Sequence, residues 1–199
     1  MQRPDRLQLT RGLVPGILLL FLTACSASLF KVKPALELPA LPANAATAEA
    51  GGLKASVAPL LSDEESQELF EANLPLGGVL PLRVELHYQT AAVPLDLKRA
   101  RLVLHDGRGR EWKLLSTKQA IKRILKANGV FLYNPNSRKQ FEKEFGAYAI
   151  DLKTPLTAAE RRRQGFLFFE TPDKTPVRSP HGLVLSITRL AQPLDIKIN

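Results

Sequence analysis

The segment from Leu82 to Gln89 alternates apolar and polar residues without interruption. Successive side chains of a β-strand point to opposite faces of a sheet, so this alternation predicts a strand with one buried and one solvated face. Two further β-rich runs, 101–105 and 111–115, flank Asp106-Gly107-Arg108-Gly109 and predict a hairpin. More strands are expected at 166–170, 182–188 and 194–198. The chain must bury several strand faces, and we expect a mainly β fold.

Helical signals interrupt the strands at two places. Ser62 precedes three acidic residues and predicts a helix start, with Glu65 completing a capping box. Apolar residues at helical spacing predict two more helices, at 116–127 and 137–148. Both lie between predicted strands, so we expect a helical insertion near 116–148. Trp112, the only tryptophan, is expected in the core.

Short strands, frequent turn signals and no regular strand–helix alternation favour an antiparallel sandwich. The order of elements over 62–190 also resembles a loosely defined group of exported bacterial proteins with immunoglobulin-like domains. The matching segments are Leu69-Phe70-Glu71-Ala72-Asn73-Leu74, Leu80-Pro81-Leu82-Arg83-Val84, Pro155-Leu156-Thr157-Ala158-Ala159-Glu160 and Gly165-Phe166-Leu167-Phe168-Phe169. The resemblance implies an immunoglobulin-like β-sandwich domain over 61–199 with an N-terminal helix, and it implies no activity. Glu71 stands where that group usually has glycine.

The first 24 residues have the three-part pattern of a secretory signal. Arg3, Arg6 and Arg11 precede an apolar run that ends in small residues just before Cys25. The run of residues 12–24 rises only about 20 Å as a helix, whereas a membrane span needs roughly 20 apolar residues. We therefore predict a signal peptide over residues 1–24 rather than a permanent transmembrane helix.

The end of this signal, Leu22-Thr23-Ala24-Cys25, resembles the lipobox of bacterial lipoproteins. The resemblance implies cleavage before Cys25, a diacylglyceryl group on its thiol and acylation of the new amino group. Several acyl chains anchor a protein stably. Ser26, where the enterobacterial sorting pattern places Asp for the inner membrane, favours the outer membrane, facing the periplasm or the cell surface. An ordinary signal peptide with a chance cysteine is the alternative.

Composition bounds the rest of the chain. Cys25 is the only cysteine, so a lipidated chain has no disulfide and its fold must rest on packing. Residues 25–60 are rich in Ala and Pro and lack periodicity, which predicts a flexible tether. The net charge of +9 becomes +7 after loss of three Arg and one Asp. In the envelope this charge favours anionic lipids, lipopolysaccharide or an acidic envelope protein as partners, and not nucleic acid.

Positive charge is concentrated in two blocks. Like charges at i, i+4 destabilise a helix, so a lysine ladder in the helix 116–127 has another role. We hypothesise that both blocks bind an anionic surface; the alternative is that they are solvated faces that keep the domain soluble. Their members are Lys118, Lys122, Arg123, Lys126, Arg161, Arg162 and Arg163.

Signals for chemistry are weak. His87, His105 and His181 lie far apart in the sequence, and we predict neither a metal site nor a cofactor. The one stretch with Ser near His is Ser179-Pro180-His181, since no G-x-S-x-G motif occurs. We predict a membrane-anchored envelope lipoprotein that acts as a non-catalytic binding, adaptor or structural module. The alternative is an envelope hydrolase with a site around Ser179 and His181 or surface carboxylates.

Lipidation is tested by replacing Cys25 with Ser and fractionating cells. We expect the variant to leave the membrane pellet and to lack the added mass of the acyl groups, because the thiol that carries them is gone. A variant that stays in the pellet with an unchanged mass would contradict the lipoprotein interpretation.

Overall fold

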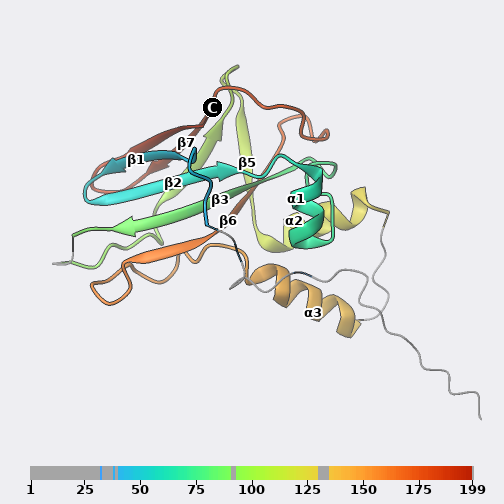
Figure 1. The fold of residues 1–199 in the computed structure, drawn as a ribbon, viewed down its shortest axis with the longest axis horizontal. Coiled ribbons are helices and arrows are strands. Elements are labelled where there is room, and N and C mark those ends of the chain that lie inside the picture. The colour runs from blue at the N-terminus through green and yellow to red at the C-terminus, as the bar shows by residue number, and fades with distance from the viewer. Residues whose placement is uncertain (1–31, 33–37, 39, 91–92, 130–134, 199) are drawn as a thin grey trace, which may run out of the picture.

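A computed structural model of the chain describes residues 32, 38, 40–90, 93–129 and 135–198. The predicted signal peptide and Cys25 lie outside these residues. The described part holds eight strands and three helices (Figure 1). The strands are β1 (Ala46–Ala50), β2 (Leu53–Pro59), β3 (Val79–Tyr88), β4 (Arg101–His105), β5 (Glu111–Leu115), β6 (Arg162–Glu170), β7 (Leu183–Thr188) and β8 (Leu194–Ile198). The helices are α1 (Asp63–Phe70), α2 (Thr117–Ala127) and α3 (Pro135–Gly146).

The strands form one nearly closed antiparallel sheet. Their order is β1-β2-β3-β6-β5-β4-β7-β8, and the edge strands β1 and β8 lie against each other. β5 connects the two halves, because Glu111 and Trp112 pair with β4 whereas Lys113 to Leu115 pair with β6. The prediction of a mainly β fold is confirmed, as are the hairpin of β4 and β5 and the burial of Trp112.

The prediction of a flexible tether over 25–60 is wrong for residues 46–59, which form β1 and β2. Every second residue of β2 from Leu53 to Val57 is buried, but one of these is an alanine, so the alternation is weakly hydrophobic. Gly51 and Gly52 join the strands with φ of 57° and 75°, the backbone of a two-residue hairpin turn. The domain therefore begins before residue 61, and α1 follows two strands instead of opening the domain.

Two other residues of the predicted tether also contact the domain. Val32 is buried and Leu38 is partly buried in the apolar cluster that lies under the helices. This cluster contains residues of all three helices, such as Phe70, Ile124 and Phe145. The chain between Cys25 and the first strand thus packs on the helical end of the molecule at two points.

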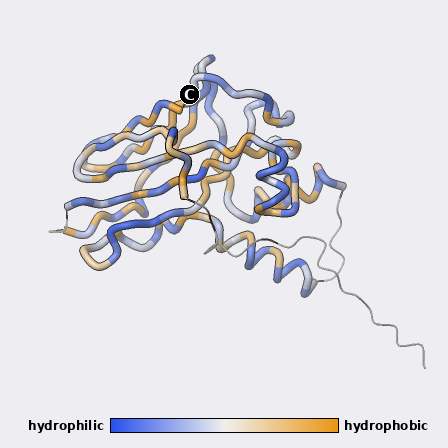
Figure 2. Tube along the Cα trace, in the orientation of Figure 1, coloured by the Kyte–Doolittle hydropathy of each residue, from blue (hydrophilic) through white to orange (hydrophobic). Residues whose placement is uncertain are grey.

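β6 separates two apolar clusters and is buried on both faces. Leu167 and Phe169 face the cluster enclosed by the sheet, while Phe166 and Phe168 face the helices. On the helical side the rings pack closely: the Phe168 and Phe145 centroids are 4.9 Å apart. Apolar and polar residues alternate along much of the sheet (Figure 2). Within the predicted alternating segment of β3, Glu85 and His87 are partly exposed between buried residues, as predicted, whereas Arg83 is buried and departs from the predicted wet face.

The helix boundaries follow from capping. Ser116 and Gln119 form a complete capping box on α2. At α1 the Ser62 hydroxyl accepts a hydrogen bond from the backbone N–H of Glu65. The same hydroxyl donates to the carboxylate of Glu64 rather than to that of Glu65. α1 ends at Glu71, whose φ of 47° is the left-handed conformation that favours glycine. The position at which the resemblance leads us to expect glycine is therefore one whose left-handed backbone favours glycine.

Replacement of Gly165 by Ala tests how tightly β6 is enclosed. An added Cβ would lie 2.6 Å from backbone atoms of Ile150, which cannot retreat without disturbing the hydrogen bond between Ile150 N and Phe166 O. We expect the free energy of unfolding in urea to fall by about 1–3 kcal/mol. Gly146→Ala is the control, since nothing lies within 4 Å of its added Cβ. Equal stability of the two variants would contradict this packing.

Candidate functional site

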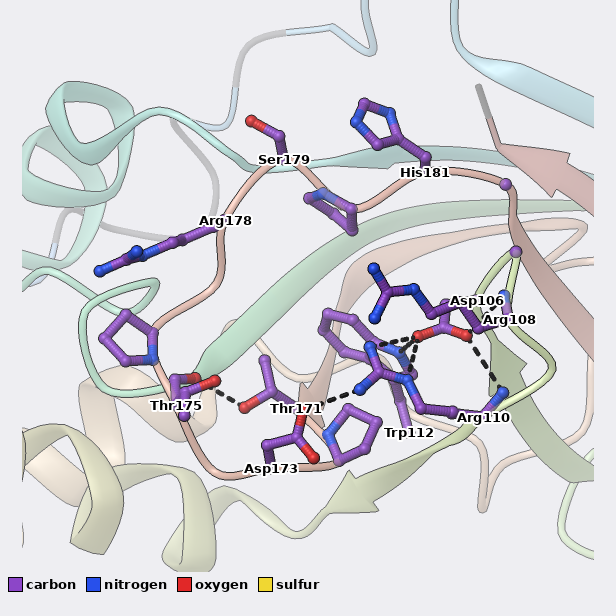
Figure 3. Close-up of a pocket in the computed structure, with 15 residues that line it drawn as sticks. Asp106, Arg108, Arg110, Trp112, Thr171, Asp173, Thr175, Arg178, Ser179 and His181 are labelled. Carbon is purple, nitrogen blue, oxygen red and sulfur yellow. Dashed lines mark hydrogen bonds and ion pairs between the residues drawn. The ribbon is translucent and has the colours of Figure 1, made fainter.

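A cleft of about 800 Å³ opens where the β4–β5 loop meets the loop that joins β6 to β7 (Figure 3). The hairpin contributes the turn at 106–110 and the indole of Trp112, and the second loop contributes residues of 171–182. Its apolar lining comes from one aromatic ring and three prolines, Trp112, Pro172, Pro176 and Pro180. Loops that join strands at one end of a rigid sheet are common places for binding sites.

Asp106 holds the hairpin side of the cleft in shape. Its carboxylate accepts hydrogen bonds of 3.0 Å from the backbone N–H groups of Arg108 and Arg110. It also accepts from the Arg110 side chain, Nε to Oδ2 2.9 Å, and from the Trp112 indole, Nε1 to Oδ2 3.4 Å. Arg110 Nη1 continues to Asp173 Oδ2 at 2.7 Å and so joins the two loops. Arg110 thereby forms ion pairs with both acidic groups of the cleft.

The same contacts control the ionisation of Asp106. Burial by itself would raise the pKa of this carboxyl, but the hydrogen bonds from Arg110, Arg108 and Trp112 outweigh burial and lower the pKa from 3.8 to about 2. Asp106 is therefore a permanent anion at physiological pH. It cannot act as a general base near pH 7, and its role is to hold the loop.

Positive charge at the cleft exceeds what these acids neutralise. The side chains of Arg108 and Arg178 are exposed, and neither has a hydrogen bond or ion pair to another described residue. Figure 3 shows the Arg108 guanidinium directed into the cleft above Arg110, while Arg178 points outward at the rim. A guanidinium beside an apolar wall provides the two groups needed to bind an anion that has an apolar body.

Ser179 and His181 lie on the rim of this cleft, but they do not form a catalytic pair. Both side chains point away from Asp106 (Figure 3), and within the described residues neither takes part in a hydrogen bond. A triad needs a nucleophile bonded to a base that a carboxylate orients. The two carboxylates that line the same cleft, Asp106 and Asp173, are both paired with Arg110.

The lysine ladder is exposed as predicted, but Arg123 does not belong to the same surface. Lys118, Lys122 and Lys126 lie on the solvated face of α2. Arg123 turns toward the sheet, where its Nε lies 2.7 Å from Glu170 Oε1 and both side chains are largely buried. It stabilises the packing of α2 against β6, so we withdraw it from the anionic-surface hypothesis.

The second basic block divides among three different environments. Arg162 and Arg163 lie in β6 and not in a turn before it. Arg162 is exposed and pairs with Glu85, Nη2 to Oε1 2.6 Å. Arg163 is buried: it pairs with Glu160 and donates to the carbonyl oxygens of Asp151, Thr154 and Pro155. Arg161 is exposed and donates to the Ala158 carbonyl. Arg163 is a structural residue, and the block forms no single patch.

Within 32, 38, 40–90, 93–129 and 135–198, no group of three or more His, Cys, Asp or Glu side chains is placed to hold a metal ion. In the same part of the chain, no helix is both long enough and apolar enough to cross a membrane. Comparisons with protein-family models, with curated proteins and with solved structures found no match to this chain.

The cleft was not predicted from the sequence, apart from Ser179 and His181 at its rim. Arg110 and Asp173 meet across a sequence separation of 63 residues, which no local pattern reveals. The available signals were the Asp106-Gly107 turn and the proline-rich run 172–180. Each predicts a surface loop, but only the strand order brings the two loops to the same end of the sheet.

Replacement of Asp106 by Asn tests its role in the cleft. Folding lowers the pKa of this group, so its stabilising effect is complete above about pH 4 and disappears as the pH falls through 2. We expect the variant to lose about 2 kcal/mol of unfolding free energy at pH 7 and to show a flatter decline below pH 4. Urea unfolding from pH 7 to pH 2 measures both effects. Asp173→Asn, at an exposed ion pair, is the control and should lose less than about 1 kcal/mol of unfolding free energy. If unfolding free energy depends on pH in the same way for Asp106→Asn and the parent, the role assigned to Asp106 is disproved.

Proposed function

We propose that this chain is a lipid-anchored lipoprotein of the cell envelope whose domain is a non-catalytic binding module. The cleft between the β4–β5 loop and the loop 171–182 is its ligand site. The ligand class that fits is a carboxylate or phosphate carried on an apolar body. Anchorage rests on the lipobox resemblance at Cys25, and the outer membrane remains the favoured location because of Ser26.

Arg108 is the observation that carries this proposal. Its guanidinium points into the cleft and has no partner among the described residues, whereas the nearby Arg110 is held by two carboxylates. A hydrogen bond between charged partners contributes about 1.5–3 kcal/mol. The cleft wall of Trp112 and three prolines would bury the apolar part of the ligand without adding a competing charge.

The fold supports a binding role by analogy. We propose that the two halves of the sheet, which enclose one apolar cluster and are joined through β5, correspond to an immunoglobulin-like sandwich. Domains of this architecture present ligand sites on the loops at their ends, which is where this cleft lies. Such an analogy concerns architecture and not chemistry.

The hydrolase remains the second candidate because Ser179 and His181 flank the same cleft. It requires both side chains to turn inward and to meet, with a carboxylate other than Asp106 behind the imidazole. Turnover of an ester that is lost in both Ser179→Ala and His181→Ala would support the hydrolase over the binding module.

Binding is tested with phenyl phosphate, which joins a small apolar ring to an anion. Trp112 is the only tryptophan, so its indole N–H gives a single reporter signal in a ¹⁵N-correlation spectrum. We expect that signal to shift with phenyl phosphate, and to shift little with inorganic phosphate or with benzyl alcohol, each of which has only one of the two groups.

Arg108→Gln should raise the dissociation constant for phenyl phosphate by about 10- to 100-fold, which corresponds to the loss of one charged hydrogen bond. Arg99→Gln is the matched control, because Arg99 is exposed and lies outside the cleft. Equal affinity of the Arg108 and Arg99 variants would refute the assignment of the site.

A further inference from the structure

The chain that leads to Cys25 is held close to the domain. Val32 is buried in the apolar cluster under the helices, and Leu38 packs against the same cluster. Only residues 26–31 separate Val32 from Cys25. Seven residues span at most about 25 Å when fully extended. An anchor at Cys25 therefore holds Val32, which is buried in the cluster under the helices, within about 25 Å of the membrane surface.

The helical end has one strongly basic face. The exposed side of α2 presents Lys118, Lys122 and Lys126, spaced one helical turn apart. α2 contains no acidic residue, and none of these three lysines has an ion pair with another described residue. The apolar face of the same helix is buried through Ala120, Ile121 and Ile124. The lysines are thus held in a row by a helix that packing fixes in place.

Charge also distinguishes α2 from its neighbours. The first turn of α1 is acidic, with Asp63, Glu64 and Glu65, so an anionic surface would repel that helix. α3 carries charges of both signs, including the ion pair of Arg138 with Glu142 at 3.0 Å. Among the three helices that contribute to the cluster with Val32, α2 is the one whose charge complements anionic headgroups.

We infer that the α2 lysine face rests on the phosphate-bearing headgroups of the membrane that holds the anchor, and that docking of Val32 and Leu38 orients the domain for this contact. The inference rests on the proposed lipid anchor at Cys25. Each lysine near an anionic surface strengthens such a contact about fivefold, so three strengthen it roughly a hundredfold. Because the contact is electrostatic, salt weakens it.

The test uses the full lipidated chain in vesicles, labelled at one introduced cysteine with an environment-sensitive fluorophore. Ala127→Cys, exposed at the C-terminal end of α2 next to Lys126, reports on the approach of this end of the helix to the membrane. Lys197→Cys, exposed on β8, reports on the sheet away from the helices. Vesicles contain phosphatidylcholine alone or with one-quarter phosphatidylglycerol, plus a headgroup-attached quencher. We expect strong quenching of the Ala127 label on anionic vesicles only, with loss of most of it in 1 M salt. The Lys197 label should be quenched little on either.

Two sets of lysine variants separate the α2 face from general charge. Lys118→Ser, Lys122→Ser and Lys126→Ser together should abolish most of the quenching at Ala127. Lys54→Ser, Lys98→Ser and Lys153→Ser remove the same charge from exposed positions elsewhere and should preserve it. Val32→Asp should release residue 32 from the apolar cluster. The domain should then adopt a wider range of orientations on the membrane, and the quenching of the Ala127 label should fall.

The outcomes distinguish this inference from the proposed function. A chain that does not float with the vesicles at all has no anchor, and both proposals fail. A chain that floats, but whose Ala127 label is quenched equally on neutral and anionic vesicles or equally in both lysine sets, refutes the α2 contact alone. In that case an acidic protein partner becomes the alternative for the lysine face.

Discussion

Burial of β6 on both faces is the constraint on which the rest of this structure depends. One side of the strand closes the apolar interior of the sheet through Leu167 and Phe169, and the other supports the helices through Phe166 and Phe168. A strand in this position can bury few polar side chains, and the two buried charged ones, Arg163 and Glu170, are both paired. The aromatic rings give the helical end a core of its own, on which the segment at Val32 also packs.

The cleft is a consequence of the strand order. β5 leaves the half-sheet of β4 and joins that of β6, which brings the hairpin turn at 106–110 beside the loop that follows β6. Asp106, which is buried, holds Arg110 in place, and Arg110 then joins the two loops through its exposed ion pair with Asp173. The backbone N–H of Arg108 belongs to this network but its guanidinium does not, so the charge of that side chain remains available to a ligand.

Arginine and lysine have different roles in this chain. Arg123 and Arg163 reach inward, Arg123 to the carboxylate of Glu170 and Arg163 to Glu160 and several carbonyl oxygens, while Arg110 joins two carboxylates across the cleft. The exposed lysines of α2 remain in solvent. Counting positive charges in the sequence treats both groups alike, and for that reason the two basic blocks looked equivalent before their partners were known.

The sequence by itself determined the local elements, because period, capping and turn residues act within a few positions: the β4–β5 hairpin, the helix α2 and the β8 strand all lie where they were predicted. It did not determine β1 and β2, whose alternation rests partly on alanine, too small for hydrophobicity alone to reveal. Only the tertiary structure decided which arginines are internal, where the cleft lies and where the tether docks. Each of these depends on contacts between segments far apart in sequence. Such contacts stabilise the chain only after the sheet has brought those segments together.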